Sequence, residues 1–338
     1  MLDIFNNDAF KMVALTAAIN KVDHVPGRAG ELAFAGVGRG VSTTSVAVEQ
    51  RGETLSLISS AARGSNPAQI NGPARVIESI SVPFFPLDAV IRADEIQNVR
   101  AFGSDNSLEG AMQVVSDRIN SLSLRHDLTL EYLRLGALKG TVVDADGTTV
   151  LVNLFNKFGV TAEAPVNFAL GTATTDVRAK CAQVIRTMQK NAKMALPGSA
   201  KVWALCGSAF FDALISHANV KGVYDGYAAA ERRLGDSYVN GIFEFGGIFF
   251  EDYRGSDDGV VGIAADEVRF FYVGAPGMYA ENYAPGDFLE TVNTIGLPRY
   301  AKLLPDPTGA NRIVTVHTQQ SPLPLCLRPK TLMSGTRV

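Results

Sequence analysis

The sequence predicts an α+β fold, and two patterns carry this prediction. One uninterrupted stretch, residues 107–139, has the apolar spacing of a single long helix. From residue 175 to residue 273 the chain then alternates between helix-like and strand-like segments, which is typical of a compact α+β domain. A chain of 338 residues can bury a sizeable core, as two domains or as one large irregular domain.

The composition favours a protein with a large permanent interface. Hydrophobic residues make up 46% of the chain and charged residues only 19%, below the roughly 25% of an ordinary soluble domain. A net charge of -3 provides no basic field, so tight sequence-specific binding to nucleic acid is not expected, although weak contact stays open. Three cysteines without a short spacing predict small buried hydrophobic side chains: Cys181, Cys206 and Cys326.

The first forty residues resemble an arm more than a core element. Residues 8–20 are amphipathic, and Gly36, Gly38 and Gly40 predict a flexible linker, because their spacing differs from that of a dinucleotide-binding loop. The N-terminus has no basic segment followed by an apolar run, and no stretch approaches 18 uncharged apolar residues. We therefore expect neither a signal peptide nor a membrane span, and no built-in scaffolding segment.

Residues 41–82 predict a long hairpin. Segments 45–49, 54–58 and 75–82 partly alternate between polar and apolar residues, and the breaker-rich stretch 61–73 predicts a loop. A hairpin with so weak a hydrophobic face is not stable alone in water and needs another surface to lie on.

Residues 107–139 form the clearest element. Steps of four and three residues predict one buried helix face made of Leu108, Met112, Val115, Ile119, Leu122, His126, Leu130 and Leu133. Asn106 with Glu109 predicts an N-terminal cap and Gly140 a stop, which gives a rod of about 50 Å. The histidine in this face is either packed and hydrogen-bonded or a pH sensor.

The remaining elements follow in order. Residues 141–143 and 148–155 predict a hairpin around the turn 144–147, and 175–194 and 208–217 predict helices. Residues 202–206, 242–252, 260–264, 268–273 and 312–319 predict strands.

Catalytic and metal-binding patterns are weak or missing. The sequence has no phosphate loop with Gly-Lys-Ser or Gly-Lys-Thr, and its four histidines lack ligand spacing, so we expect no cofactor and no metal. Ser208 lacks the second glycine of a nucleophile elbow, which favours a helix cap. Asp252, Asp257 and Asp258 resemble a calcium loop only loosely, so a solvated turn is the preferred interpretation.

The order of arm, long hairpin, long helix, short hairpin, α+β domain and returning strand resembles the Hong Kong 97-type capsid fold of tailed phages. More narrowly, the chain resembles the lambda-type capsid protein E family over nearly its whole length. The specific segments are Val25-Pro26-Gly27, residues 296–302 and residues 320–327.

The resemblance implies a division of the chain and a function without catalysis. Residues 1–40 would be the N-terminal arm, 41–82 an extended loop that overlaps the next subunit, 83–170 with 291–338 a peripheral domain, and 171–290 an axial domain. The chain would be a major capsid protein that assembles into an icosahedral shell around phage DNA. An encapsulin-type compartment and an unrecognised cytoplasmic α+β enzyme are the alternatives.

The resemblance also implies partners and contact residues. Copies of the chain would form pentamers and hexamers in the host cytoplasm, with a scaffolding protein, a portal and in some relatives a decoration protein, and would touch packaged DNA weakly. Hypothetical assembly residues are Arg51, Glu53, Arg63, Arg75, Arg232 and Arg233, the last two either on a helix face near its C-terminus or against a neighbour. Some relatives lock their shells by isopeptide bonds from an extended-loop lysine, yet no lysine lies between Lys21 and Lys139.

Overall fold

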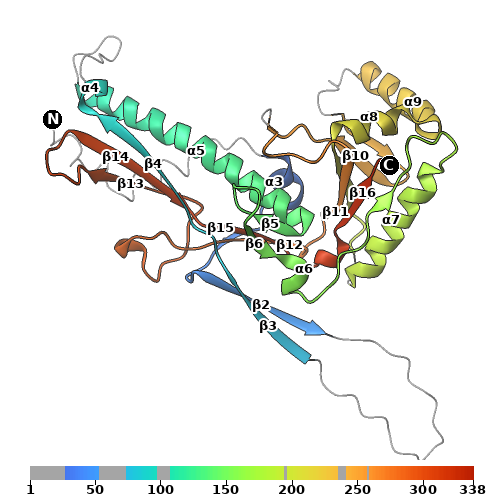
Figure 1. Ribbon diagram of the computed structural model, residues 1–338, viewed down its shortest axis with the longest axis horizontal. Helices are drawn as coiled ribbons and strands as arrows, with labels where there is room; N and C mark the ends of the chain where they lie inside the picture. The colour runs from blue at the N-terminus through green and yellow to red at the C-terminus, as the bar shows by residue number, and fades with distance from the viewer. Residues whose placement is uncertain (1–26, 53–73, 97–106, 194–195, 235–240, 257–258) are drawn as a thin grey trace, which may run out of the picture.

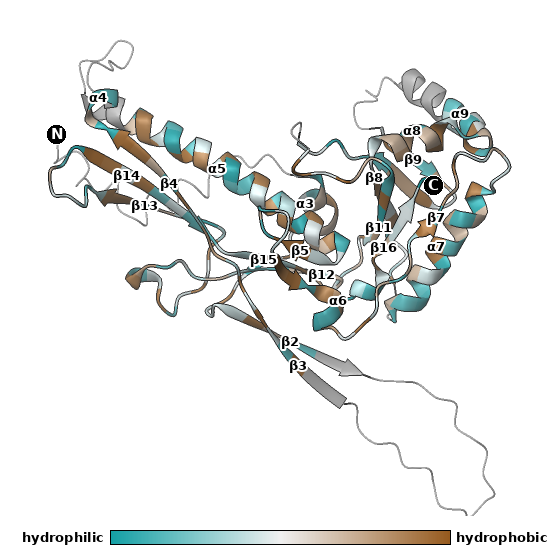
Figure 2. Ribbon diagram, viewed as in Figure 1, coloured by the Kyte–Doolittle hydropathy of each residue, from teal (hydrophilic) through white to brown (hydrophobic). Residues whose placement is uncertain are grey.

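Helix α5 (Ser107–Lys139) is the axis of the fold and confirms the predicted range 107–139. The computed structural model describes residues 27–52, 74–96, 107–193, 196–234, 241–256 and 259–338, so the expected cap at Asn106 lies outside it. Gly140 ends the helix with φ at +84°, where a Cβ atom would lie 2.2 Å from the Phe155 ring. Figure 2 shows hydrophilic and hydrophobic residues alternating along α5, as a helix with one buried face requires.

An antiparallel sheet covers the first half of α5. Its order is β13 (Tyr300–Pro305), β14 (Ile313–Gln320) and β4 (Phe85–Arg92), and the short α4 (Ala93–Ile96) follows β4. The predicted strand 312–319 is confirmed as β14. The sheet and the helix share a small core of Ile91, Val115, Ile119, Leu122, Ala301 and Val316.

A mixed six-stranded sheet forms the other end of the molecule. Its order is β7 (Val166–Asn167), β16 (Met333–Thr336), β11 (Glu267–Val273), β8 (Lys201–Cys206), β10 (Ile248–Asp252) and β9 (Phe243–Phe245). Helices α7 (Val177–Ala192), α8 (Ser208–Ser216) and α9 (Ala218–Leu234) gather around it in Figure 1. The predicted helices 175–194 and 208–217 and strands 202–206 and 268–273 are confirmed within two residues.

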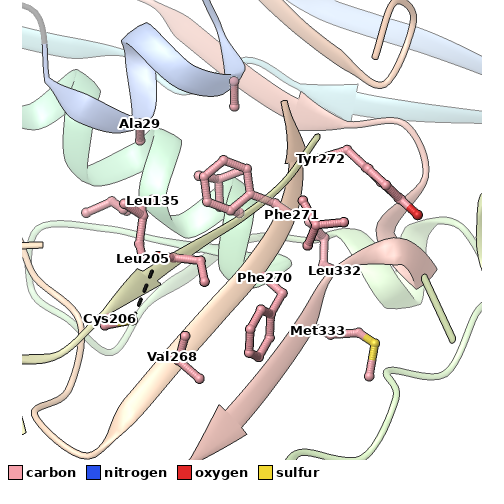
Figure 3. Close-up of a cluster of buried hydrophobic side chains, with 14 of the residues drawn as sticks. Ala29, Leu135, Leu205, Cys206, Val268, Phe270, Phe271, Tyr272, Leu332 and Met333 are labelled. Atoms are coloured by element: carbon pink, nitrogen blue, oxygen red, sulfur yellow. Dashed lines mark hydrogen bonds between the residues drawn. The ribbon is translucent and has the colours of Figure 1, made fainter. Parts of the chain in front are cut away.

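The main core lies on both faces of this sheet. Phe270 of β11 packs with Phe168 and Phe250, with ring centroids 5.8 and 6.2 Å apart. Its neighbour Phe271 is also fully buried, and the alternation of a strand directs it to the opposite face. In Figure 3 the labelled residues of α5 and of β8, β11 and β16 meet in this core.

A third sheet joins three distant parts of the chain. β12 (Tyr279–Tyr283) lies between β1 (Gly38–Gly40), to which it is parallel, and β15 (Pro322–Cys326), to which it is antiparallel. The predicted flexible linker at residues 36–40 is therefore wrong. Glycines fit here because a Cβ on Gly40 would lie 2.2 Å from the carbonyl oxygen of Gly296.

Smaller elements complete the fold. α3 (Arg28–Ala33) precedes β1, and the 3-10 turns η2 (Leu289–Thr291) and η3 (Pro329–Thr331) lie in the second half of the chain. β5 (Thr141–Val143) pairs with β6 (Val150–Asn153), but the predicted strand 148–155 ends early. The Asn153 side chain accepts from the backbone N–H of Asn156 at 3.0 Å and starts α6 (Leu154–Lys157).

Two other predicted strands differ from the structure. The range 242–252 is a hairpin of β9 and β10, because Gly246 and Gly247 have φ of +60° and +83° and turn the chain. Residues 260–264 form no strand; Val261 instead closes a loop with Ser256 through two hydrogen bonds of 2.9 Å.

The predicted domain boundaries at 171 and 290 stay a prediction. The six-stranded sheet includes β7 and β16, which lie outside that range, whereas β12 inside the range joins β1 and β15. Within the described residues, no helix has both the length and the apolar character needed to cross a membrane.

Candidate assembly surfaces

The hairpin of β2 (Ser45–Gly52) and β3 (Ala74–Ser81) is the first candidate surface, since it projects away from the rest of the chain (Figure 1). Its strands pair antiparallel, with Ser45 opposite Ser81 and Gly52 opposite Ala74. No third strand joins this pair among the residues that the structure describes. The outer edges of the hairpin can therefore bind the backbone of another chain.

Only the root of the hairpin packs against the body. Ile80 is 2% exposed, whereas Ile77 is 66% exposed. From α6, the Nζ atom of Lys157 donates to the carbonyl oxygen of Ser79 at 3.4 Å and lies 3.7 Å from the Glu78 carboxylate. Because an isolated two-stranded hairpin is marginally stable at best, the exposed part needs a second surface.

The arginines expected in assembly lie on two separate elements. Arg51 and Arg75 occupy opposite positions in the register of β2 and β3. Arg232 and Arg233 lie in the last turn of α9, which agrees with a helix face near a C-terminus. The side chains of these four residues lie outside the description, as do Glu53 and Arg63 altogether, so their proposed contacts stay predictions.

The apolar face of α5 is buried where the two cores cover it. Its buried members, each at most 5% exposed, are Val115, Ile119, Leu122, His126, Leu130 and Leu133. Met112 is 42% exposed, so its assignment to the core is wrong. The first fully buried residue of α5 in the core with the β13-β14-β4 sheet is Val115, one turn after Met112. The side chain of Leu108 lies outside the description.

His126 is packed and hydrogen-bonded, as one of the two sequence interpretations predicted. Its Nε2 atom lies 2.9 Å from the Thr318 hydroxyl. That hydroxyl donates to the carbonyl oxygen of Leu87 at 2.9 Å, so it accepts from an Nε2–H of a neutral imidazole. Burial, and to a lesser degree the nearby charges of Arg299 and His317, lowers the pKa of His126 to about 4.

Glu131 joins the start of α3 to α5. Its carboxylate accepts from the backbone N–H groups of Ala29 and Gly30 at 2.7 and 3.2 Å and from the Tyr253 hydroxyl at 3.0 Å. These N–H groups belong to the first turn of α3 and have no partner within that helix. A carboxylate from α5 thus satisfies them, and a Cβ on Gly27 would lie 2.1 Å from it.

Two further buried carboxylates complete this junction. Arg134 of α5 donates from Nε and Nη2 to Glu281 of β12 at 2.9 and 3.0 Å. Arg28 of α3 donates to Glu251 of β10 at 2.5 and 3.1 Å, and the Trp203 indole N–H donates to the same carboxylate at 2.7 Å. Together the three carboxylates fix α3, α5 and two sheets relative to one another.

Sequence reasoning did not identify this junction, although one signal was present. Glu131 and Arg134 lie in the last turns of α5, where the residues around them are almost all apolar and buried. Charged residues on a helix that is buried all round require partners. Their partners Tyr253 and Glu281 lie more than 100 residues further along the chain, so no local pattern identifies them.

The carboxylates of Asp127, Glu131 and Glu251 beside the junction already have hydrogen-bond partners within the protein. A cavity of about 450 Å³ is lined by Asp127, Glu131 and Glu251, and each of these carboxylates accepts hydrogen bonds from the protein. Across the described ranges, no three His, Cys, Asp or Glu side chains form a metal-binding group. Of the loosely calcium-like cluster, Asp252 lies in β10, while Asp257 and Asp258 are outside the description.

The cysteines and Ser208 have structural surroundings. All three cysteines are free and buried, which confirms the prediction, and burial raises the pKa of Cys181 and of Cys326 to about 12. The expected cap by Ser208 is wrong: Gly207 is the N-cap of α8 and Ser208 its first residue. Only glycine fits there, because a Cβ on Gly207 would lie 2.1 Å from the carbonyl oxygen of Ala264.

Comparison with protein families gives one match over nearly the whole chain. A family described as "Phage major capsid protein E" matches residues 11–337. The major capsid protein of Pseudomonas phage KPP10 is 28% identical, and the aligned region covers 96% of each chain. The major capsid protein of Salmonella phage Felix O1 is 27% identical, with 70% of this chain and 68% of the relative aligned.

The solved structures agree on the fold. A chain from the capsid of cyanophage A-1(L) superposes with a TM-score of 0.52 at 13% identity, and 94% of each chain is covered. Such low identity supports the fold alone. The described elements therefore have the Hong Kong 97-like capsid fold.

Proposed function

This chain belongs to the phage major capsid protein E family, and from that premise we propose that its β2–β3 hairpin is an extended loop that overlaps a neighbouring subunit. The protein is a structural subunit of the virion shell, which many copies build together. An encapsulin-type compartment and an unrecognised enzyme are not favoured, because the family and both curated relatives are phage major capsid proteins.

The observation that carries the proposal is the projecting two-stranded hairpin with a buried root and exposed strands. A neighbour would supply the second surface that the hairpin lacks. Arg51 and Arg75 occupy opposite positions in the register, and carboxylates of the neighbour would pair with them in this proposal.

The proposed division of labour assigns a domain to each end of the molecule. The β13-β14-β4 sheet with α5 would be the peripheral domain, and the six-stranded sheet with α7, α8 and α9 the axial domain that meets its copies around a capsomer. Arg232 and Arg233 of α9 would then face a neighbour within the capsomer. Many moderate contacts of this kind become strong collectively once the shell closes.

The remaining partners belong to the proposal as well. Pentamers and hexamers would assemble in the host cytoplasm on a separate scaffolding protein and around a portal. The net charge of -3 supports only weak, non-specific contact with packaged DNA. A decoration protein would bind where capsomers meet. Uniform shells formed by this chain expressed alone would contradict the need for a scaffold.

Deletion of residues 59–71 tests the role of the hairpin. The variant should give soluble subunits or capsomers with the six-stranded sheet folded, and no closed shells in negative-stain electron micrographs. A second variant, in which Gly-Ser repeats of equal length replace residues 59–71, separates the length of the loop from its sequence. Normal shells from the deletion would refute the overlap.

A further inference from the structure

The loop between β12 and β13 exposes an unusual number of apolar side chains. Four of them lie within nine positions, namely Leu289, Val292, Ile295 and Leu297, with exposed fractions of 92, 61, 71 and 43%. Figure 1 shows this loop as a separate protrusion next to the root of the β2–β3 hairpin. Exposed apolar side chains that are clustered, unlike single ones, mark an interaction site.

The loop is held in one shape. The N–H of Gly296 donates to the carbonyl oxygen of Val41 at 2.9 Å, and the N–H of Leu297 donates to the Tyr300 hydroxyl at 2.8 Å. The Thr291 hydroxyl is 2.5 Å from the carbonyl oxygen of Gly286. A surface fixed in advance loses little conformational entropy when it binds.

The loop also has no unpaired charge. From residue 289 to residue 298 the only ionisable side chain is Glu290, and its carboxylate lies 2.6 Å from the Nζ atom of Lys302. Lys302 in turn lies 5.1 Å from the centre of the Phe288 ring. An apolar surface whose one charge is paired suits a similarly apolar partner and does not repel an identical copy.

The loop and the hairpin root form one continuous surface. A Cβ on Gly40 would lie 2.2 Å from the carbonyl oxygen of Gly296, and the N–H of Gly296 donates to the carbonyl oxygen of Val41, so the two backbones are in direct contact. The N–H of Val41 also donates to the carbonyl oxygen of Tyr283 at 2.9 Å, at the end of β12 from which the loop starts. A neighbour that binds the hairpin root is therefore brought close to the apolar loop.

We propose that residues 289–297 form an apolar contact with a second copy of this chain in the assembled shell. The inference rests on the proposed function and adds a contact outside the hairpin. A second copy is the partner that the features favour, because the loop is rigid, neutral and continuous with the surface proposed to meet a neighbour. A scaffolding or decoration protein is the competing partner that the test has to distinguish.

A cysteine at position 289 tests the contact directly. The native cysteines are buried, so a maleimide should label only Leu289→Cys under native conditions. We expect rapid labelling of the free subunit and loss of labelling in shells made with the other head proteins of the phage and then freed of scaffold. Equal labelling in subunits and empty shells would overturn the proposal, and so would protection seen only with a bound second protein.

A triple variant, Leu289→Ser, Val292→Ser and Ile295→Ser, tests the energetic role of the loop. It should unfold like the wild type, because these side chains are exposed, yet need about tenfold or more subunit for assembly. Val150→Ser, which alters an apolar residue of β6 that is 54% exposed, is the matched control. Assembly of the triple variant at the wild-type concentration would also overturn the contact.

The two experiments separate this inference from the proposed function. If the wild type forms no shells with all head proteins present, the proposed function is refuted, and the proposed contact is refuted with it. If the wild type forms shells but the cysteine at position 289 is still labelled in shells, only the proposed contact is refuted.

Discussion

Single buried charges stabilise this fold only as members of complete pairs. Glu281 has no exposed surface, and Arg134 and the Tyr283 hydroxyl both donate to its carboxylate. Removal of one partner from such a pair leaves the other charge buried without compensation. The pair of Arg269 and Glu267, with an N–O distance of 2.5 Å, is only partly buried, with side chains 24% and 36% exposed, so solvent can replace a lost partner.

We therefore expect Glu281→Ala to lower the free energy of unfolding by about 3–5 kcal/mol. Glu267→Ala is the matched control, since it also removes a glutamate from an arginine pair, and it should change the value by about 1 kcal/mol or less. Denaturant titration of both purified subunits measures the difference. Equal, small effects would mean that the junction around Arg134 is not structural.

His126 makes the fold sensitive to acid. Its pKa is about 4 in the folded chain, against 6.5 for a free side chain. As the pH falls, the unfolded chain takes up this proton first, so His126 contributes stability above pH 6.5 that is lost between pH 6.5 and 4. The loss amounts to about 3 kcal/mol.

His126→Gln should flatten the dependence of stability on pH in that window, because an amide does not titrate and can still bond to Thr318. Chemical denaturation at pH 7, 6, 5 and 4, set to resolve this window, measures the slope. Leu124→Ala on the same helix changes no titratable group and should keep the wild-type slope. A His126→Gln variant with that same slope would show that the acid sensitivity originates elsewhere.

Among the elements, α5 contributes buried residues to both hydrophobic cores of the molecule. Ile119 and Leu122 are each 4% exposed and lie in the core with the β13-β14-β4 sheet. Ile119→Ala or Leu122→Ala should each cost about 2–5 kcal/mol of stability, because the truncation leaves a cavity.

Leu124 provides the control for that prediction, since it lies on the same helix and is 54% exposed. Leu124→Ala should change the stability by about 0.5 kcal/mol or less. Thermal unfolding of the three variants gives the comparison. Core variants that unfold within a degree of the wild type would show that this face of α5 is not buried.

Elements governed by local periodicity were predictable from the sequence, and α5 shows why. Its apolar residues recur with the helical period, and Gly140 ends the helix, so both signals are local. The exposure of Met112 was not predictable, because it depends on where the sheet formed by distant strands begins. The strand β1 has no local signal either: it is three residues long and exists through pairing with β12.

The prediction of a strand at residues 260–264 was wrong for a related reason. Its apolar residues suggested an extended segment, but Val261 bonds twice to Ser256 and closes a loop. Conversely, the order of all elements together was informative, because it matched one family over nearly the whole chain. Which residues contact a neighbouring subunit depends on how copies of the chain meet. A single sequence does not contain that information.

For the whole molecule, the positions of the lysines decide whether isopeptide bonds can cross-link the shell. No lysine lies between Lys21 and Lys139, so the hairpin region offers only arginines, whose guanidinium stays protonated and is a poor nucleophile. We expect a shell held by non-covalent contacts. Mature particles boiled in denaturing detergent with reductant should then run as one band, at the monomer mass or its cleaved form. A ladder of covalent oligomers would contradict this.

The parallel pairing of β1 with β12 determines how the subunit bears mechanical load. If a neighbour holds the hairpin as proposed, it would pull on β1 through Val41, so that the tension would enter that strand from its end. The hydrogen bonds between β1 and β12 are then loaded in shear and must break together, whereas bonds that are peeled apart fail one at a time. From β12 the load would pass through Glu281 and Arg134 into α5, so tension in the shell wall would be spread along the longest helix of the described chain.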